Sequence, residues 1–120
     1  MLPSVDAIRT IAVLGAGTMG RGIAHVAALA GYRVALHDID EAAAARGLDA
    51  IRHNLAKGVE LGKLTAEVRD AALARIRTTT DRAGACAAAD AVIEAAPEIL
   101  ALKQRIFADV AAAAAARALL

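Results

Sequence analysis

The chain is poor in the residues that would indicate secretion or nucleic-acid binding. Its 120 residues include one cysteine, no tryptophan, one tyrosine and one phenylalanine, and its formal net charge is +1. A single cysteine excludes a disulfide within the chain, which fits a reducing cytoplasm. Because lysine and arginine are scattered and aromatic stacking platforms are missing, nucleic acid is not expected as a partner.

The sequence also lacks a membrane span and a targeting segment. No apolar run is long enough to cross a bilayer, and residues 1–10 have neither signal-peptide nor transit-peptide character. A length of 120 residues allows one domain at most. Alanine supplies more than a quarter of the residues, which favours closely packed helices. We therefore expect one cytoplasmic domain, residues 1–120, with no membrane partner.

A run of four apolar residues at positions 11–14 leads directly into the pattern Gly-x-Gly-x-x-Gly at positions 15–20. Such a run is typical of a buried parallel strand. Gly15 allows a tight turn, Gly17 lets the backbone approach a pyrophosphate, and Gly20 lets the next helix pack closely on the strand. The start of that helix offers free N–H groups to phosphates. The predicted dinucleotide-binding residues here are Gly15, Ala16, Gly17, Thr18, Met19 and Gly20.

An acidic residue follows the next expected strand at the distance that a dinucleotide fold requires. Asp38 lies 21 positions after Gly17, where a carboxylate accepts hydrogen bonds from the adenosine ribose hydroxyls. A carboxylate there repels a 2′-phosphate, and the next residue, Ile39, cannot bind one, so we predict NAD rather than NADP. The alternative is that Asp38 only caps the turn after the strand. The glycine motif favours the ribose role.

Alternating strand and helix patterns predict an α/β fold with a Rossmann-type parallel sheet. Strands are expected at residues 10–14, 33–37, 76–80 and 91–96, and helices at about residues 18–30, 41–57, 66–75 and 81–89. A further helix after Pro97 leads to residues 117–120, which resemble the start of a fifth strand, so the sheet is expected to be truncated there. The apolar stripe expected on the first helix consists of Met19, Ile23, Val26, Ala27 and Ala30.

The 37 residues between Asp38 and the third strand are more than one crossover helix needs. We interpret them as a helical pair inserted between strands two and three, with Thr65 as the N-cap of its second helix. Basic residues in the insertion are mixed with acidic ones, which favours a solvated face over an anion site. The buried face of its first helix is expected to carry Ala44, Leu48, Ile51 and Leu55.

Taken together, these features resemble the N-terminal NAD-binding domain of the L-3-hydroxyacyl-CoA dehydrogenase family. The resemblance covers essentially all 120 residues, and the helical insertion is its most discriminating feature. The residues that carry it are positions 15–20 (GAGTMG), 21–25 (RGIAH), Asp38, positions 62–65 (GKLT), positions 92–98 (VIEAAPE), Leu102 and Lys103.

The resemblance implies an enzyme that oxidises the 3-hydroxyl of an L-3-hydroxyacyl-CoA to a ketone and passes hydride to NAD, as in fatty acid β-oxidation. Asp38 and the glycine bend, which we define as residues 15–20, would hold the adenosine diphosphate half, and Glu98 and Lys103 would contact the nicotinamide side. Without the family, Glu98 would be interpreted as a helix N-terminal acid and Lys103 as a solvated lysine. Asn54, where the family has serine, and Lys63 are candidates for contact with the CoA portion of an acyl-CoA substrate.

The resemblance places the family's catalytic histidine, its glutamate partner and its dimer-forming helical domain beyond residue 120. We therefore expect these 120 residues to bind NAD without turning over substrate, and the full-length protein to be a homodimer. None of His25, His37 and His53 is expected to replace the base, because none is spaced beside a carboxylate near the nicotinamide. No metal site is predicted. Cys86 lacks a basic neighbour, which favours a buried side chain over a nucleophile.

Two other functions fit the same residues. The first is a dehydrogenase of this architecture that acts on a 3-hydroxy acid without CoA. The second is a non-catalytic module that binds NAD, as lens crystallins of this family do. A histidine–glutamate pair in the continuation of the chain would argue against the second.

Overall fold

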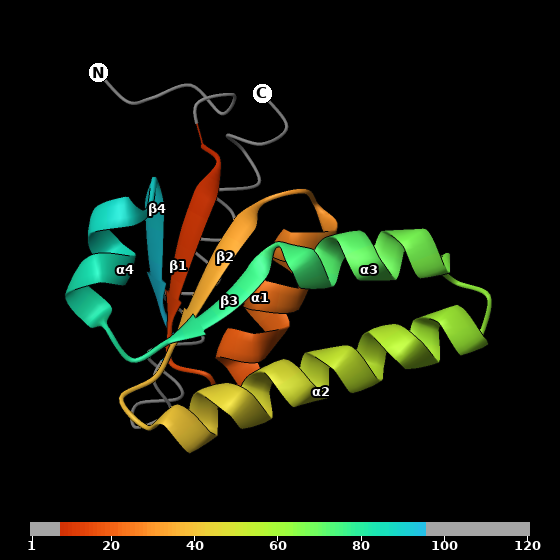
Figure 1. Cartoon of the computed structure of the whole chain (residues 1–120), viewed down its shortest axis with the longest axis horizontal. Coiled ribbons are helices and arrows are strands. Elements are labelled where there is room, and N and C mark those ends of the chain that lie inside the picture. Colours follow the sequence, from red (N-terminus) through yellow and green to blue (C-terminus); the bar gives the residue numbers. More distant parts are fainter. Residues whose placement is uncertain (1–7, 96–120) are drawn as a thin grey trace.

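The computed structural model describes residues 8–95, which form a four-stranded sheet with four helices (Figure 1). The strands are β1 (Thr10–Leu14), β2 (Arg33–His37), β3 (Ile76–Thr79) and β4 (Ala91–Glu94). The helices are α1 (Thr18–Leu29), α2 (Glu41–Glu60), α3 (Ala66–Ala74) and α4 (Arg82–Ala88). Every element expected within this range is present. The helix expected after Pro97 and the start of a fifth strand lie outside the described residues.

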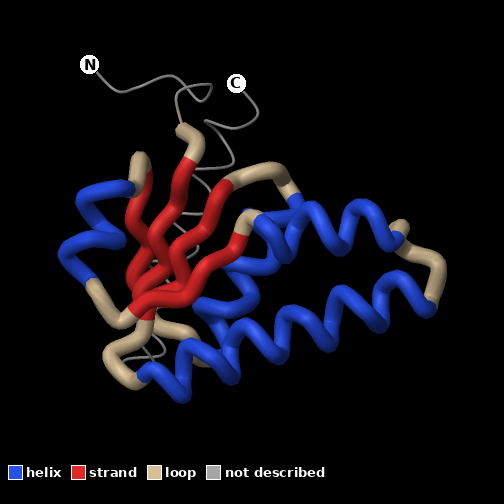
Figure 2. The backbone as a smooth tube through the Cα atoms, viewed as in Figure 1, coloured by secondary structure: helices blue, strands red, loops and turns tan. Residues whose placement is uncertain are grey.

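The four strands are parallel and lie in the order β3-β2-β1-β4 (Figure 2). The chain builds outward from β1 to β2 and β3, and then returns to the other side of β1 to add β4. In this register, Leu14 at the end of β1 lies opposite His37 of β2 and Glu94 of β4. The direction of winding therefore reverses at β1, where open α/β sheets bind their ligands. The topology confirms the predicted Rossmann-type sheet.

The central strands are buried on both faces, as the apolar run predicts. Val13 and Leu36 pack in the core that α1, α2 and α3 cover, whereas Ala12 and Ala35 pack against Ala85 of α4. The second layer is built from alanine, which lets α4 lie close to the sheet. Alanine thus contributes to both faces of the sheet, and on the face under α1, α2 and α3 it packs together with larger aliphatic residues such as Leu36, Ile51 and Leu55.

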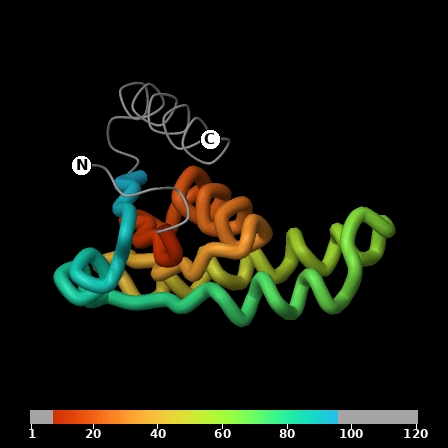
Figure 3. The backbone as a smooth tube through the Cα atoms, turned by 90° about the horizontal axis from the view of Figure 1, so that it is seen from above, coloured from red at the N-terminus to blue at the C-terminus, as the bar shows by residue number. Residues whose placement is uncertain are grey.

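The residues between β2 and β3 form the predicted helical pair, and α2 and α3 extend away from the sheet side by side (Figure 3). Ala44, Ile51 and Leu55 are buried, which confirms the expected inner face of α2. Thr65 is the N-cap of α3, because its Oγ1 accepts a hydrogen bond of 3.2 Å from the Val68 N–H. None of the helices within residues 8–95 has the length and apolar character to cross a bilayer.

The expected inner stripe of α1 is partly wrong. Val26 is 67% exposed and Ala30 is exposed, whereas the buried residues of the helix are Gly20, Ala24, Ala27 and Ala28. The reason is the short distance between α1 and the strand end. A Cβ at Gly20 would collide with the carbonyl oxygen of Gly15. No side chain fits at Gly20, and the residues that α1 buries deepest are small ones, while Ile23 and Leu29 pack beside them and Val26 faces away.

Gly20→Ala should destabilise the chain by about 2 kcal/mol, because the added methyl group would push α1 away from the bend. Gly22→Ala is the matched control, since a Cβ at Gly22 has no heavy atom within 4 Å outside its own helix. Alanine is the better helix former, so the control should gain up to about 1 kcal/mol. Urea unfolding of both variants measures the difference, and equal stability of the two would contradict the close approach.

Candidate functional site

The glycine bend after β1 has the geometry that its three glycines predict. Gly15 has φ +105°, a conformation that side chains rarely adopt, and its N–H donates a 2.7 Å hydrogen bond to the His37 carbonyl oxygen. This bond joins the bend to the end of β2. A Cβ at Gly17 would meet no heavy atom within 4 Å, whereas one at Gly20 would collide with the bend. The bend is therefore tight against α1 and open at Gly17.

The amino terminus of α1 differs from that of every other described helix. Side chains cap α2, α3 and α4, through Asp40, Thr65 and Asp81 respectively. The N-cap of α1 is Gly17, which offers no side-chain hydrogen bond, and the first turn of α1 contains no acidic residue. The first N–H groups of α1 thus have no side chain to satisfy them. Such a terminus suits a phosphate group.

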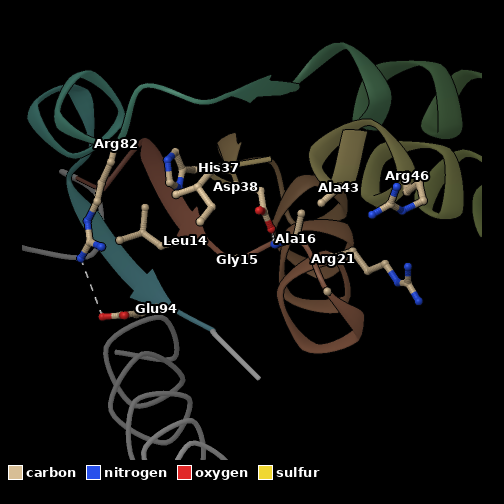
Figure 4. A pocket seen from close by; sticks show the side chains of 12 residues that line it. Leu14, Gly15, Ala16, Arg21, His37, Asp38, Ala43, Arg46, Arg82 and Glu94 are labelled. Carbon is tan, nitrogen blue, oxygen red and sulfur yellow. Dashed lines mark hydrogen bonds and ion pairs between the residues drawn. The ribbon is translucent and has the colours of Figure 1, made fainter. Parts of the chain in front are cut away.

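A pocket of about 400 Å³ lies at the carboxyl ends of β1, β2 and β4 (Figure 4). Gly15, Ala16 and Gly17 of the glycine bend line it, whereas Thr18, Met19 and Gly20 do not, and helices α1, α2 and α4 each contribute an arginine. The full lining consists of Leu14, Gly15, Ala16, Gly17, Arg21, His37, Asp38, Ile39, Ala43, Arg46, Arg82 and Glu94. The structure thus brings the glycine bend and Asp38 together in one pocket.

Asp38 is held in place by backbone donors on both sides. Its Oδ2 accepts a hydrogen bond from the Ala16 N–H and its Oδ1 accepts one from the Asp40 N–H, each at 3.1 Å. Partial burial opposes ionisation, but these N–H groups and the charge of His37 outweigh it and lower the pKa of Asp38. Asp38 therefore does cap the turn after β2, as the alternative supposed. Each carboxylate oxygen can accept more than one hydrogen bond, so capping leaves capacity for ribose hydroxyls.

Sequence reasoning missed three arginines of this pocket as site residues. Arg21 lies one helical turn into α1 and donates to Thr18 Oγ1 at 3.4 Å, and Arg46 lies on α2. Arg82, at the start of α4, forms an ion pair with Glu94 at 3.9 Å. Arg21 and Arg46 lie within the first two turns of the helices that follow β1 and β2. Their positions in the sequence could therefore have indicated that they lie near the strand ends. Arg82 follows β3, which is not adjacent to β1 in the sheet. Its place in the pocket therefore depends on the order of the strands, which the sequence does not show.

His37 is the buried polar residue of the pocket. Its side chain is 4% exposed, and its Nε2 has no hydrogen-bond partner within the described part of the chain. The other histidines differ from it: His25 is half-buried on α1, where burial lowers its pKa, and His53 is exposed on α2. Neither lines the pocket. Residues 8–95 also contain no group of three or more His, Cys, Asp or Glu side chains that could hold a metal ion.

Some predicted site residues lie elsewhere. Asn54 on α2 and Lys63 beyond its end are exposed and do not line the pocket, so the structure does not join them to the glycine bend. Glu98 and Lys103 lie outside the described residues. Cys86 is half-buried within α4. The assignments of Asn54, Lys63, Glu98 and Lys103 stay predictions.

The comparisons with known proteins agree on one family. A sequence model described as 3-hydroxyacyl-CoA dehydrogenase, NAD binding domain, matches residues 10–120. The chain is 49% identical over 104 residues to 3-hydroxyadipyl-CoA dehydrogenase of Escherichia coli K12, which covers 87% of the chain and 22% of that protein. It is 41% identical over 105 residues to 3-hydroxybutyryl-CoA dehydrogenase of Bradyrhizobium diazoefficiens, covering 88% of the chain and 36% of the relative.

A solved structure gives the same result. The crystal structure of (S)-3-hydroxybutyryl-CoA dehydrogenase from Ralstonia eutropha matches with a TM-score of 0.73 and 39% identity, over 87% of this chain and 36% of that one. The chain thus spans 22% to 36% of the length of these relatives.

Two carboxylates at opposite ends of β1 should make stability depend on pH. Asp90 Oδ2 accepts hydrogen bonds from the N–H groups of Arg9 and Thr10, which lower the pKa of Asp90 as the turn donors lower that of Asp38. A lowered pKa in the folded state contributes stability above the unfolded value of about 3.9, and this is lost as the pH falls through the folded value. Asp38→Asn and Asp90→Asn should each lose less stability than wild type between about pH 6 and about pH 3.

Urea midpoints at the two pH values measure this effect. The stability of the double variant should depend least on pH. The two carboxylates share no hydrogen-bond partner, so their effects should add. An unchanged pH dependence in Asp38→Asn would contradict the hydrogen-bonding of its carboxylate.

Proposed function

Because the chain belongs to the 3-hydroxyacyl-CoA dehydrogenase family through its NAD-binding domain, we propose that it is the cofactor-binding part of an enzyme that oxidises L-3-hydroxyacyl-CoA to 3-oxoacyl-CoA. One observation carries the proposal. The glycine bend, the uncapped start of α1 and the carboxylate of Asp38 line a single pocket at the point where the winding of the sheet reverses.

The residues of the pocket fit the parts of a dinucleotide. The open position at Gly17 and the first N–H groups of α1 suit the pyrophosphate, with Arg21 adding positive charge one turn later. Asp38, oriented by the Ala16 and Asp40 N–H groups, is the acceptor for the adenosine ribose hydroxyls. NAD, when bound, supplies the hydride acceptor. The protein orients it by these contacts.

The same residues favour NAD over NADP. Asp38 is ionised at neutral pH, as a carboxyl group with an ordinary or lowered pKa is, and an ionised carboxylate repels a 2′-phosphate. Ile39, which follows it, is 89% exposed and has no charge to offer. Arg46 lines the same pocket and its positive charge would attract a 2′-phosphate. The Asp38 carboxylate opposes that attraction, because two backbone N–H groups hold it in position.

We propose that the base that removes the hydroxyl proton lies outside residues 8–95. Such a base must reach the substrate hydroxyl through a hydrogen bond. His53 is exposed on the helical pair, and His25 does not line the pocket. His37 does line it, but next to Asp38, on the adenosine side of the site. By resemblance to the family, we propose that the full-length protein is a homodimer that serves fatty acid β-oxidation. The single cysteine leads us to propose that it is cytoplasmic.

Asp38→Asn should weaken NADH binding about tenfold, because an amide replaces the charged acceptor for the ribose hydroxyls. Asp90→Asn is the matched control: its carboxylate also holds two backbone N–H groups, but at the amino end of β1 and away from the pocket. The control should bind NADH within about twofold of wild type. NADH fluorescence titration gives both affinities.

Titration with NADPH extends this test. Wild type should bind NADH at least about tenfold more tightly than NADPH, and Asp38→Asn should narrow that difference by removing the repulsion. A preference of the wild type for NADPH would refute the assignment of the cofactor.

The 120-residue chain should not oxidise NADH when it is mixed with acetoacetyl-CoA in a single-turnover experiment, although it binds NADH. The whole protein should oxidise NADH with acetoacetyl-CoA and not with free acetoacetate, because we propose a CoA thioester as substrate. Absorbance at the NADH band measures both reactions. Clear oxidation by the 120-residue chain would show that the base lies within it, and a preference for the free acid would favour the alternative substrate class.

A further inference from the structure

The pocket continues beyond Asp38 on the side away from the arginines of α1 and α2. Figure 4 shows Leu14, His37, Arg82 and Glu94 on one side of Asp38, and Arg21, Ala43 and Arg46 on the other. We call the first group the distal lobe. In a dinucleotide the base and the pyrophosphate are attached to different carbons of the ribose. A ribose held at Asp38 with its pyrophosphate at the glycine bend therefore directs its base toward the distal lobe.

His37, which lines the distal lobe, carries a buried polar atom without a partner. His37 is 4% exposed, and its Nε2 has no hydrogen-bond partner among residues 8–95. Burying a polar atom without a partner costs free energy, and native structures rarely do so without a functional reason. A leucine at the end of β2 would fill the same space without that cost. The presence of histidine therefore indicates a partner that arrives in the pocket.

The other walls of the lobe suit the faces of a flat base. Ile39, which follows Asp38 and lines the same pocket, is 89% exposed, the most exposed of the large hydrophobic residues among those described. Leu14, which also lines the pocket, is 5% exposed. The Arg82 guanidinium is planar, its side chain is 61% exposed, and Glu94 holds it at the rim of the pocket. Apolar side chains and a planar cation can cover the faces of a base, and an imidazole can meet its edge.

We propose that His37 is a specificity-determining residue that forms a hydrogen bond with the purine base of the cofactor in the distal lobe. This inference rests on the proposed function, because it needs the dinucleotide to lie across Asp38. Neutral imidazole nitrogens can donate or accept, and an adenine edge offers both kinds of group. The hydrogen bond would satisfy the atom that the folded chain leaves without a partner.

The test compares two variants of the chain with two ligands. His37→Leu keeps the bulk of the side chain and removes its polar atoms, whereas His37→Gln keeps an amide that can reach the position of Nε2. The ligands are NADH and reduced nicotinamide cytosine dinucleotide, which keeps both riboses and the pyrophosphate and replaces only the base. NADH-type fluorescence measures binding of both ligands.

His37→Leu should weaken NADH binding about fivefold to tenfold, the size expected for one lost hydrogen bond. It should change binding of the cytosine dinucleotide by less than about twofold, and His37→Gln should bind NADH within about twofold of wild type. The melting temperature of His37→Leu without ligand should be equal to or above that of wild type, since the variant buries no unpaired polar atom. A variant that is more stable and yet binds NADH less tightly would separate recognition from folding.

Two results would overturn the inference while leaving the proposed function intact. One is unchanged NADH affinity in His37→Leu. The other is an equal loss for both dinucleotides, which would give His37 a structural role instead of a base contact. If wild type bound neither dinucleotide, the proposed function and this inference would both fail.

Discussion

The hydrogen bond from the Gly15 N–H to the His37 carbonyl oxygen is the interaction on which the site depends. It draws the bend after β1 against the end of β2, at a φ of +105° that glycine adopts without strain. Because the bend is held there, α1 can begin at Thr18, after its N-cap Gly17, and pass so close to the bend that Gly20 has no room for a Cβ. Gly17, the N-cap of α1 that offers no side-chain hydrogen bond, then lines the pocket.

The same strand is fastened at both ends by carboxylates. Asp90 accepts hydrogen bonds from backbone N–H groups at the start of β1, and Asp38 accepts one from Ala16 just after its end. Only Asp38 lines the pocket. The two residues use the same chemistry, a carboxylate held by backbone donors, but one serves the fold and the other serves the fold and the site together. The choice between turn cap and ribose acceptor was therefore not an exclusive one.

The arginines and His37 give the pocket two chemically different sides. Arg21 and Arg46 place positive charge near the bend, whereas the distal lobe combines apolar contact, a planar cation and a buried imidazole. A ligand with a charged middle and a flat base at one end matches this division. Ala43 and Arg46 near the start of α2 line the pocket, whereas the exposed Asn54 and Lys63 farther along the helical pair do not.

The sequence alone determined the α/β class, the parallel sheet and the helical pair, because periodicity, glycine spacing and cap residues are local properties that neighbouring residues impose on one another. It also determined the glycine bend and Asp38 as a pair, since their spacing follows from one strand–helix–strand unit. Tertiary structure alone decided that α1 presents small residues to the sheet, which depends on the distance between two packed elements. It alone brought Arg82 of α4 and Glu94 of β4 to the pocket, because β4 returns to the far side of β1. It alone left the Nε2 of His37 buried without a partner, since burial depends on what the rest of the chain packs around a residue.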